Sequence, residues 1–98
     1  MVSGRPAVLV IAGSDSSGGA GIVRDLRVLA DLKVEALCAI TAVTAQTHGQ
    51  LISAHHVPPG LVQAQIRTAL ESTAVGAIKM GMLGTAATVR AVAEALPP

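Results

Sequence analysis

The chain has 98 residues, a formal net charge of +1 and 51% hydrophobic residues, yet it contains no Phe, Tyr or Trp. Nucleic acids are bound through clustered Lys and Arg and through stacked aromatic rings, so this composition argues against a nucleic-acid partner. Charged residues interrupt every apolar run before it reaches the about 20 residues that span a membrane, and the single cysteine, Cys38, excludes an internal disulfide. We therefore expect one small cytoplasmic domain over residues 1–98, with no membrane partner.

Strand-like and helix-like runs alternate along the chain. Continuous apolar runs predict three strands, near Ala7–Ala12, Ala36–Ala45 and Val75–Leu83. Helical spacing of apolar residues predicts three helices, at about Ala20–Lys33, Leu61–Ser72 and Ala86–Leu96. Three strand–helix units in this order predict an α/β fold with a parallel sheet and right-handed crossovers.

Ligands of such sheets bind beyond the carboxyl ends of the strands, which fall here at Gly13–Ser17, Thr44–His48 and Met80–Gly84. Three parallel strands form a very small sheet with open edges. We therefore expect the chain to be part of something larger, and to self-associate or to pair with a complementary C-terminal chain.

A glycine-rich turn joins the first strand to the first helix. Glycine lets the backbone approach a ligand closely because it has no Cβ, and the following helix start offers free N–H groups. Gly13 and Gly18 have the spacing of a P-loop, but Gly19-Ala20 stands where that loop needs Lys and Ser or Thr. The turn therefore favours close approach to a ligand without the usual nucleotide motif.

Two polar residues near this turn are candidate binding groups. Asp25 falls on the inward side of the first helix, where it either meets a ligand or is a border carboxylate that pairs with backbone. Gln46 ends the second strand, and its amide either reads the edge of a heterocycle or faces solvent. For Asp15 a turn-forming and helix-capping role is favoured over a role as a ligand-binding group.

The third strand carries a further group of candidates. Lys79 either extends to an edge or balances a carboxylate, while Met80 and Met82 either line a pocket or fill the core. The adjacent His55 and His56 could suggest a metal site, but adjacent residues of an extended chain point in opposite directions and no second pair has ligand spacing. We therefore expect these two histidines in a loop. The sequence thus predicts no metal site.

Four motifs in order resemble one family. They are Ala12-Gly-Ser-Asp-Ser-Ser-Gly-Gly-Ala-Gly-Ile22, Ala39-Ile-Thr-Ala-Val-Thr-Ala-Gln46, Val57-Pro-Pro59 and Ala77-Ile-Lys-Met-Gly-Met-Leu83. Essentially the whole chain resembles the N-terminal part of the hydroxymethylpyrimidine/phosphomethylpyrimidine kinases of thiamine biosynthesis. Those enzymes are ribokinase-like, and pyridoxal kinases are their relatives.

The resemblance implies a three-layer ribokinase-like fold whose C-terminal part is missing here. It also implies phosphorylation of the small-molecule substrate 4-amino-5-hydroxymethyl-2-methylpyrimidine, and then of its monophosphate, with ATP and Mg²⁺. On this resemblance the substrate-binding residues are Gly13, Asp25, Gln46 and Met80.

The same resemblance assigns the catalytic base, the anion hole and the nucleotide site to a C-terminal half, so it implies no catalytic residue within these 98 residues. We expect the isolated chain to bind no cofactor and to have no kinase turnover. The alternatives are a non-catalytic pyrimidine-binding module, a remnant of a split gene, and a kinase of the pyridoxal type.

Overall fold

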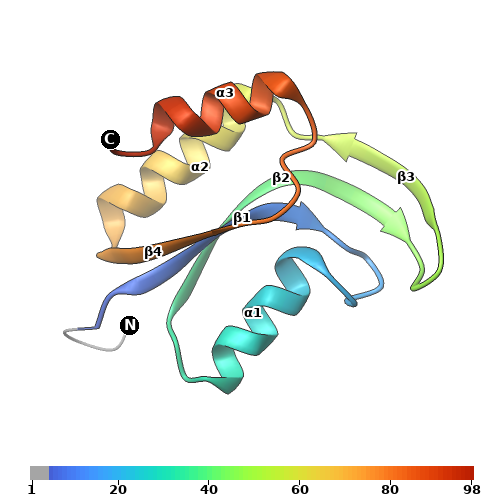
Figure 1. Ribbon diagram of the computed structural model, residues 1–98, viewed down its shortest axis with the longest axis horizontal. Coiled ribbons are helices and arrows are strands. Elements are labelled where there is room, and N and C mark those ends of the chain that lie inside the picture. The colour runs from blue at the N-terminus through green and yellow to red at the C-terminus, as the bar shows by residue number, and fades with distance from the viewer. Residues whose placement is uncertain (1–4) are drawn as a thin grey trace.

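The computed structural model describes residues 5–98 and places one four-stranded sheet between two helical layers (Figure 1). The elements in chain order are β1 (Ala7–Ser14), α1 (Gly21–Asp31), β2 (Ala36–Gln46), β3 (Leu51–His56), α2 (Pro59–Ser72), β4 (Val75–Met80) and α3 (Ala86–Ala95). The strand order across the sheet is β3-β2-β1-β4. Strands β2 and β4 run parallel to β1, as the sequence predicts.

The central strand β1 is apolar throughout because both of its faces are covered. On one face Leu9 and Ile11 pack against Val62 and Ile66 of α2 in a cluster that Val92 of α3 joins. On the other face Val10 and Ala12 pack against Ile22 of α1. The alternation of side chains along β1 thus holds the three layers together, and the predicted α/β fold is confirmed.

Strand β3 is a correction to the all-parallel sheet that the sequence predicts. Leu51–His56 pairs antiparallel with the end of β2, so the sheet is mixed, and His55 and His56 lie in this strand and not in a loop. All six residues of β3 are exposed. Without a buried face, the segment has no hydrophobic pattern by which sequence reasoning could detect it.

The helix and strand ends set the geometry at the carboxyl edge of the sheet. Helix α3 begins as predicted, because the Thr88 backbone N–H donates to Thr85 Oγ1 at 3.1 Å. Strand β4 ends at Met80, earlier than the predicted Leu83, and the chain then leaves the sheet. The hairpin of β2 and β3 extends past the end of β1 (Figure 1), and its Ser53 and Ala54 pair with Ala45 and Thr44.

Candidate functional site

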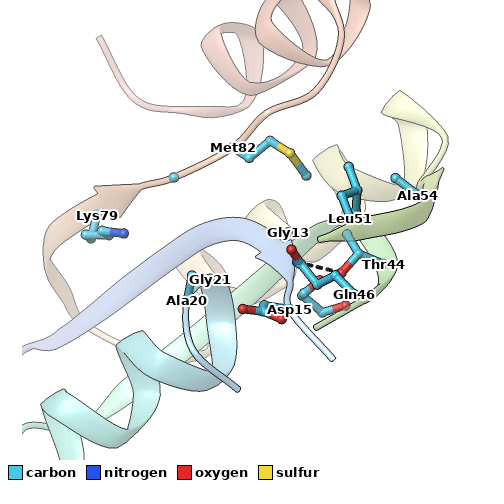
Figure 2. Close-up of a pocket in the computed structure, with 12 residues that line it drawn as sticks. Gly13, Asp15, Ala20, Gly21, Thr44, Gln46, Leu51, Ala54, Lys79 and Met82 are labelled. Atoms are coloured by element: carbon cyan, nitrogen blue, oxygen red, sulfur yellow. Dashed lines mark hydrogen bonds between the residues drawn. The ribbon is translucent and has the colours of Figure 1, made fainter. Parts of the chain in front are cut away.

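A cavity of about 280 Å³ lies at the carboxyl ends of β1, β2 and β4 (Figure 2). Its lining comes from the glycine-rich turn, from the β2–β3 hairpin and from the segment that follows β4. The lining residues are Gly13, Ser14, Asp15, Ala20, Gly21, Thr44, Gln46, Leu51, Ala54, Lys79, Gly81 and Met82. The cavity is slightly below the usual volume range of small-molecule sites, which begins at about 300 Å³. Gly13 and Gln46 therefore share one cavity.

The glycine-rich turn is held in shape by Asp15. Its Oδ1 accepts hydrogen bonds from the Ser17 backbone N–H at 2.8 Å and from the Ser17 hydroxyl at 2.7 Å. The hydrogen bond from the Ser17 hydroxyl has the largest effect on the pKa of the Asp15 carboxyl and lowers it, and backbone N–H groups of the same turn also lower it, while partial burial opposes them. Asp15 thus forms the turn, as predicted, but the N-cap position of α1 is Ala20.

Two glycines let the turn fold back on itself. Gly21 has φ +63°, a backbone conformation that other residues rarely adopt, and a Cβ there would overlap the Gly13 carbonyl oxygen. A Cβ on Gly13 would lie 2.7 Å from Met82 Cε. Gly21 is therefore required for the backbone conformation of the turn, whereas Gly13 leaves room for the end of the flexible Met82 side chain.

Gln46 is oriented by two neighbours. Its Nε2 donates to Thr44 Oγ1 at 2.9 Å, and that hydroxyl donates in turn to the Ser14 carbonyl at 2.5 Å. The Ser16 hydroxyl accepts from the Gln46 backbone N–H at 2.8 Å and donates to the Gln46 carbonyl at 3.1 Å. The hairpin and the glycine-rich turn are thus joined, and the Gln46 amide has a fixed direction.

Met80, the last residue of β4, and Met82, which follows the strand, have different positions. The Met82 carbonyl accepts from Thr41 Oγ1 at 2.6 Å, and its side chain lies over Gly13 as an apolar wall of the cavity. Met80, the candidate taken from the family motif, is 51% exposed and is not among the lining residues. In the sequence the two methionines flank Gly81 symmetrically, and only the path of the chain after β4 determines that Met82, and not Met80, lines the cavity.

Asp25 and Lys79 form an ion pair at the rim of the cavity. Lys79 Nζ lies 2.8 Å from Asp25 Oδ2, and the two side chains are 51% and 19% exposed. Lys79 lines the cavity, whereas Asp25 does not. Of the two roles that the sequence leaves open for Lys79, balancing a carboxylate is therefore the observed one.

Within residues 5–98 there is no group of three His, Cys, Asp or Glu side chains placed to hold a metal ion. Among the same residues, no helix combines the length and the apolar character needed to cross a membrane. The only charged side chains among the lining residues described here are those of Asp15 and Lys79. The cavity is therefore a small, mainly apolar pocket with one well-oriented amide and one ammonium.

The family model described as phosphomethylpyrimidine kinase matches residues 15–98, which is most of the chain. The chain belongs to the phosphomethylpyrimidine kinase family. The hydroxymethylpyrimidine/phosphomethylpyrimidine kinase of Streptomyces coelicolor is 44% identical over 91 residues, which are 93% of this chain and 34% of that protein. The chain thus spans about a third of the length of the curated relatives that it matches.

Solved structures of phosphomethylpyrimidine kinases and of pyridoxal kinases share the ribokinase-like fold described above. The crystal structure of phosphomethylpyrimidine kinase from Clostridium difficile matches with a TM-score of 0.88 and 32% identity, over 93% of this chain and 39% of that one. Pyridoxal kinase from Staphylococcus aureus in complex with AMP-PCP and pyridoxal matches with a TM-score of 0.80 and 34% identity, over 92% of this chain and 34% of that one. The sequence thus identifies the family, and the fold is shared with both groups of kinases.

Proposed function

We propose that this chain forms the substrate-binding part of a hydroxymethylpyrimidine/phosphomethylpyrimidine kinase, an enzyme that transfers the γ-phosphoryl group of ATP to a pyrimidine precursor of thiamine. The family and the pocket at the carboxyl ends of the strands support this function. The observation that carries the proposal is the fixed Gln46 amide in that pocket. Gly13, Gln46, Asp25 and Met80 remain our proposed substrate-binding residues, the first two in the cavity lining and the last two outside it, and Met82 of the lining is added.

The Gln46 amide suits an aminopyrimidine. Because one N–H of Nε2 is directed to Thr44 Oγ1, its second N–H and the Oε1 lone pairs are left for a ligand. An exocyclic amino group beside a ring nitrogen presents a donor next to an acceptor, which an amide can match with two hydrogen bonds, as it does on adenine. Met82 and Gly13 then offer apolar surface and close backbone approach to the flat ring.

ATP and Mg²⁺ belong to the proposed reaction, but the described residues do not fit them. Among residues 5–98, Asp15 is the one carboxylate in the cavity lining, and its Oδ1 accepts the hydrogen bonds of its own turn. Phosphoryl transfer needs a metal-bound nucleotide, a positioned base and donors for the transferred group. We assign these to the part of the family's fold that this chain does not cover, and we expect the chain alone to bind a pyrimidine without turnover.

A kinase of the pyridoxal type is the second candidate, favoured by the match to the Staphylococcus aureus pyridoxal kinase with pyridoxal bound. Pyridoxal has no amino group beside its ring nitrogen, so the Gln46 amide matches only part of it. A non-catalytic module that holds a pyrimidine would use the same pocket. The relative affinities for the pyrimidine and for pyridoxal separate the two kinase candidates.

The test is calorimetric titration of the chain with 4-amino-5-hydroxymethyl-2-methylpyrimidine and with pyridoxal. We expect the pyrimidine to bind more tightly, and Gln46→Ala to weaken its binding by about tenfold, since a lost pair of hydrogen bonds costs about 1–2 kcal/mol. Gln50→Ala removes an exposed amide from the same hairpin outside the cavity and is the matched control. Tighter binding of pyridoxal, or equal effects of the two variants, contradicts the proposal.

A further inference from the structure

The cavity contains a cation that binding of a neutral ring does not use. Asp15 and Lys79 are the charged residues of its lining within the described chain, and the Asp15 carboxylate is turned to Ser17 of its own loop. The Lys79 ammonium is therefore the charge that a ligand in the cavity meets. Because the Asp15 carboxylate is engaged within its own loop and the Lys79 ammonium is not, the cavity favours a ligand that carries an anionic group.

Asp25 fixes the position of the Lys79 ammonium and leaves it accessible. A lysine ammonium has three N–H donors, and one of them is directed to Asp25 Oδ2 at 2.8 Å. Because Asp25 lies outside the cavity lining and Lys79 is 51% exposed, the other donors can reach a ligand. The ion pair thus orders a long, flexible side chain before a ligand arrives, which lowers the entropy lost on binding.

Gly81 lies next to the Lys79 ammonium and lets the chain that follows β4 pass close to β1. A Cβ on Gly81 would lie 2.9 Å from Ala12 Cβ, so glycine is required for this close approach, and it would lie 3.7 Å from Lys79 Nζ, which places Gly81 beside the ammonium. Figure 2 shows the Lys79 nitrogen directed toward the cavity, with Gln46 on the opposite side. The cavity therefore has an amide at one side and a cation at the other.

We propose that Lys79, positioned by Asp25, is the specificity-determining residue that makes this pocket prefer a phosphorylated pyrimidine to the free alcohol. This inference rests on the proposed function. The ring edge engages Gln46, and the phosphomethyl arm is the part of the ligand that reaches the ammonium. A phosphate monoester carries a charge of about −1.5 to −2 at neutral pH, so its contact with Lys79 is a charge-assisted hydrogen bond.

The test compares two ligands that differ only in the phosphate, 4-amino-5-hydroxymethyl-2-methylpyrimidine and its monophosphate, by calorimetric titration of the full 98-residue chain at low ionic strength. We expect the monophosphate to bind about tenfold more tightly, which corresponds to about 1.4 kcal/mol, and the preference to shrink as salt is added. Lys79→Met should weaken binding of the monophosphate far more than binding of the alcohol, and Lys79→Arg should retain most of the preference.

The matched control is Arg67→Met, which removes one positive charge from the exposed surface of α2 on the other face of the sheet and should keep the preference. Equal affinity of the wild-type chain for the two ligands overturns the Lys79 inference alone. An equal loss of affinity for the alcohol and for the monophosphate in Lys79→Met has the same consequence. If the folded chain binds neither ligand, the proposed function fails and this inference fails with it.

Discussion

Gly21 and Gly13 show at the residue scale how the site depends on the absence of side chains. Gly21 closes the turn by pairing with Ser14 while its φ is +63°. Any Cβ at this position would overlap the Gly13 carbonyl oxygen, and the neighbouring Met82 methyl already fills the space over Gly13. The shape of the chain at this end of the sheet is therefore set by two residues that contribute no side-chain contacts.

Gly21→Ala should lower the free energy of unfolding by about 1–3 kcal/mol or more, since a left-handed backbone costs that much in a non-glycine residue before the overlap is counted. Gly60→Ala is the matched control. Its Cβ would meet nothing within 4 Å, and it lies in α2, so this change should stabilise the chain by about 0.5–1 kcal/mol. Urea unfolding of both variants tests the contrast, and equal midpoints would contradict it.

Asp15 makes the free energy of unfolding decrease at acidic pH. Because the hydrogen bond from Ser17 lowers the pKa of its carboxyl below 3.8 in the folded chain, the unfolded chain takes up the proton first as the pH falls. The contribution of Asp15 is therefore fully present above the unfolded pKa and is lost as the pH falls through the lower folded pKa. Asp15→Asn should flatten the decline in the urea midpoint below about pH 4, and an unchanged pH profile would sink this assignment.

At the element scale, the Gln65 side chain makes the backbone hydrogen bonds to β2 that a neighbouring strand would otherwise make. Strand β3 pairs with β2 only from Ala42 to Gln46, which leaves the first half of β2 without a neighbour on that side. There Gln65 of α2 accepts from the Ile40 N–H at 2.8 Å and donates to the Ile40 carbonyl at 3.0 Å. One amide thus satisfies a strand residue and ties α2 to the sheet.

Gln65→Ala should destabilise the chain by about 1–3 kcal/mol, because it leaves two partly buried backbone groups of Ile40 without partners. Gln63→Ala serves for comparison, since that side chain bonds only one backbone carbonyl, of Ala91, and the Glu94 carboxylate, which is exposed. The destabilisation by Gln63→Ala should therefore be smaller than that by Gln65→Ala. Thermal unfolding of both variants checks the order, and the reverse order would contradict the role given to Gln65.

The elements that the sequence predicts are those with a buried face. Strand β1 and helix α2 have apolar residues at the spacing that burial requires, and the structure has them close to the predicted ranges. Strand β3 was missed because Leu51–His56 owes its form to pairing with β2 and not to its own pattern. The position of Gln46 at the carboxyl edge of the sheet could be predicted from its place at a strand end, and its binding role is implied only by the family resemblance. The Lys79–Asp25 contact depends on how α1 packs beside β4.

At the scale of the whole molecule, both outer strands of the sheet are exposed. Within residues 5–98, strands β3 and β4 have one neighbouring strand each, so each presents a row of backbone N–H and C=O groups that no further strand of this part of the chain pairs with. On the β2–β3 hairpin, Val43 and Ile52 are 57% and 62% exposed. An edge strand with apolar side chains is a template for pairing with another chain, which gives the self-association expected from the sequence a specific location.

We predict that the chain self-associates through this hairpin, so that its sedimentation coefficient rises with concentration. Ile52→Lys should reduce the association, because a charge on an edge strand opposes pairing with a second copy. Leu32→Lys is the matched control, since Leu32 is 67% exposed at the end of α1 and lies outside the sheet. Sedimentation velocity over a wide concentration range distinguishes the variants. A sedimentation coefficient of the wild-type chain that does not change with concentration contradicts self-association. An equal effect of Ile52→Lys and Leu32→Lys contradicts association through the β2–β3 hairpin, because added surface charge alone would then explain the change.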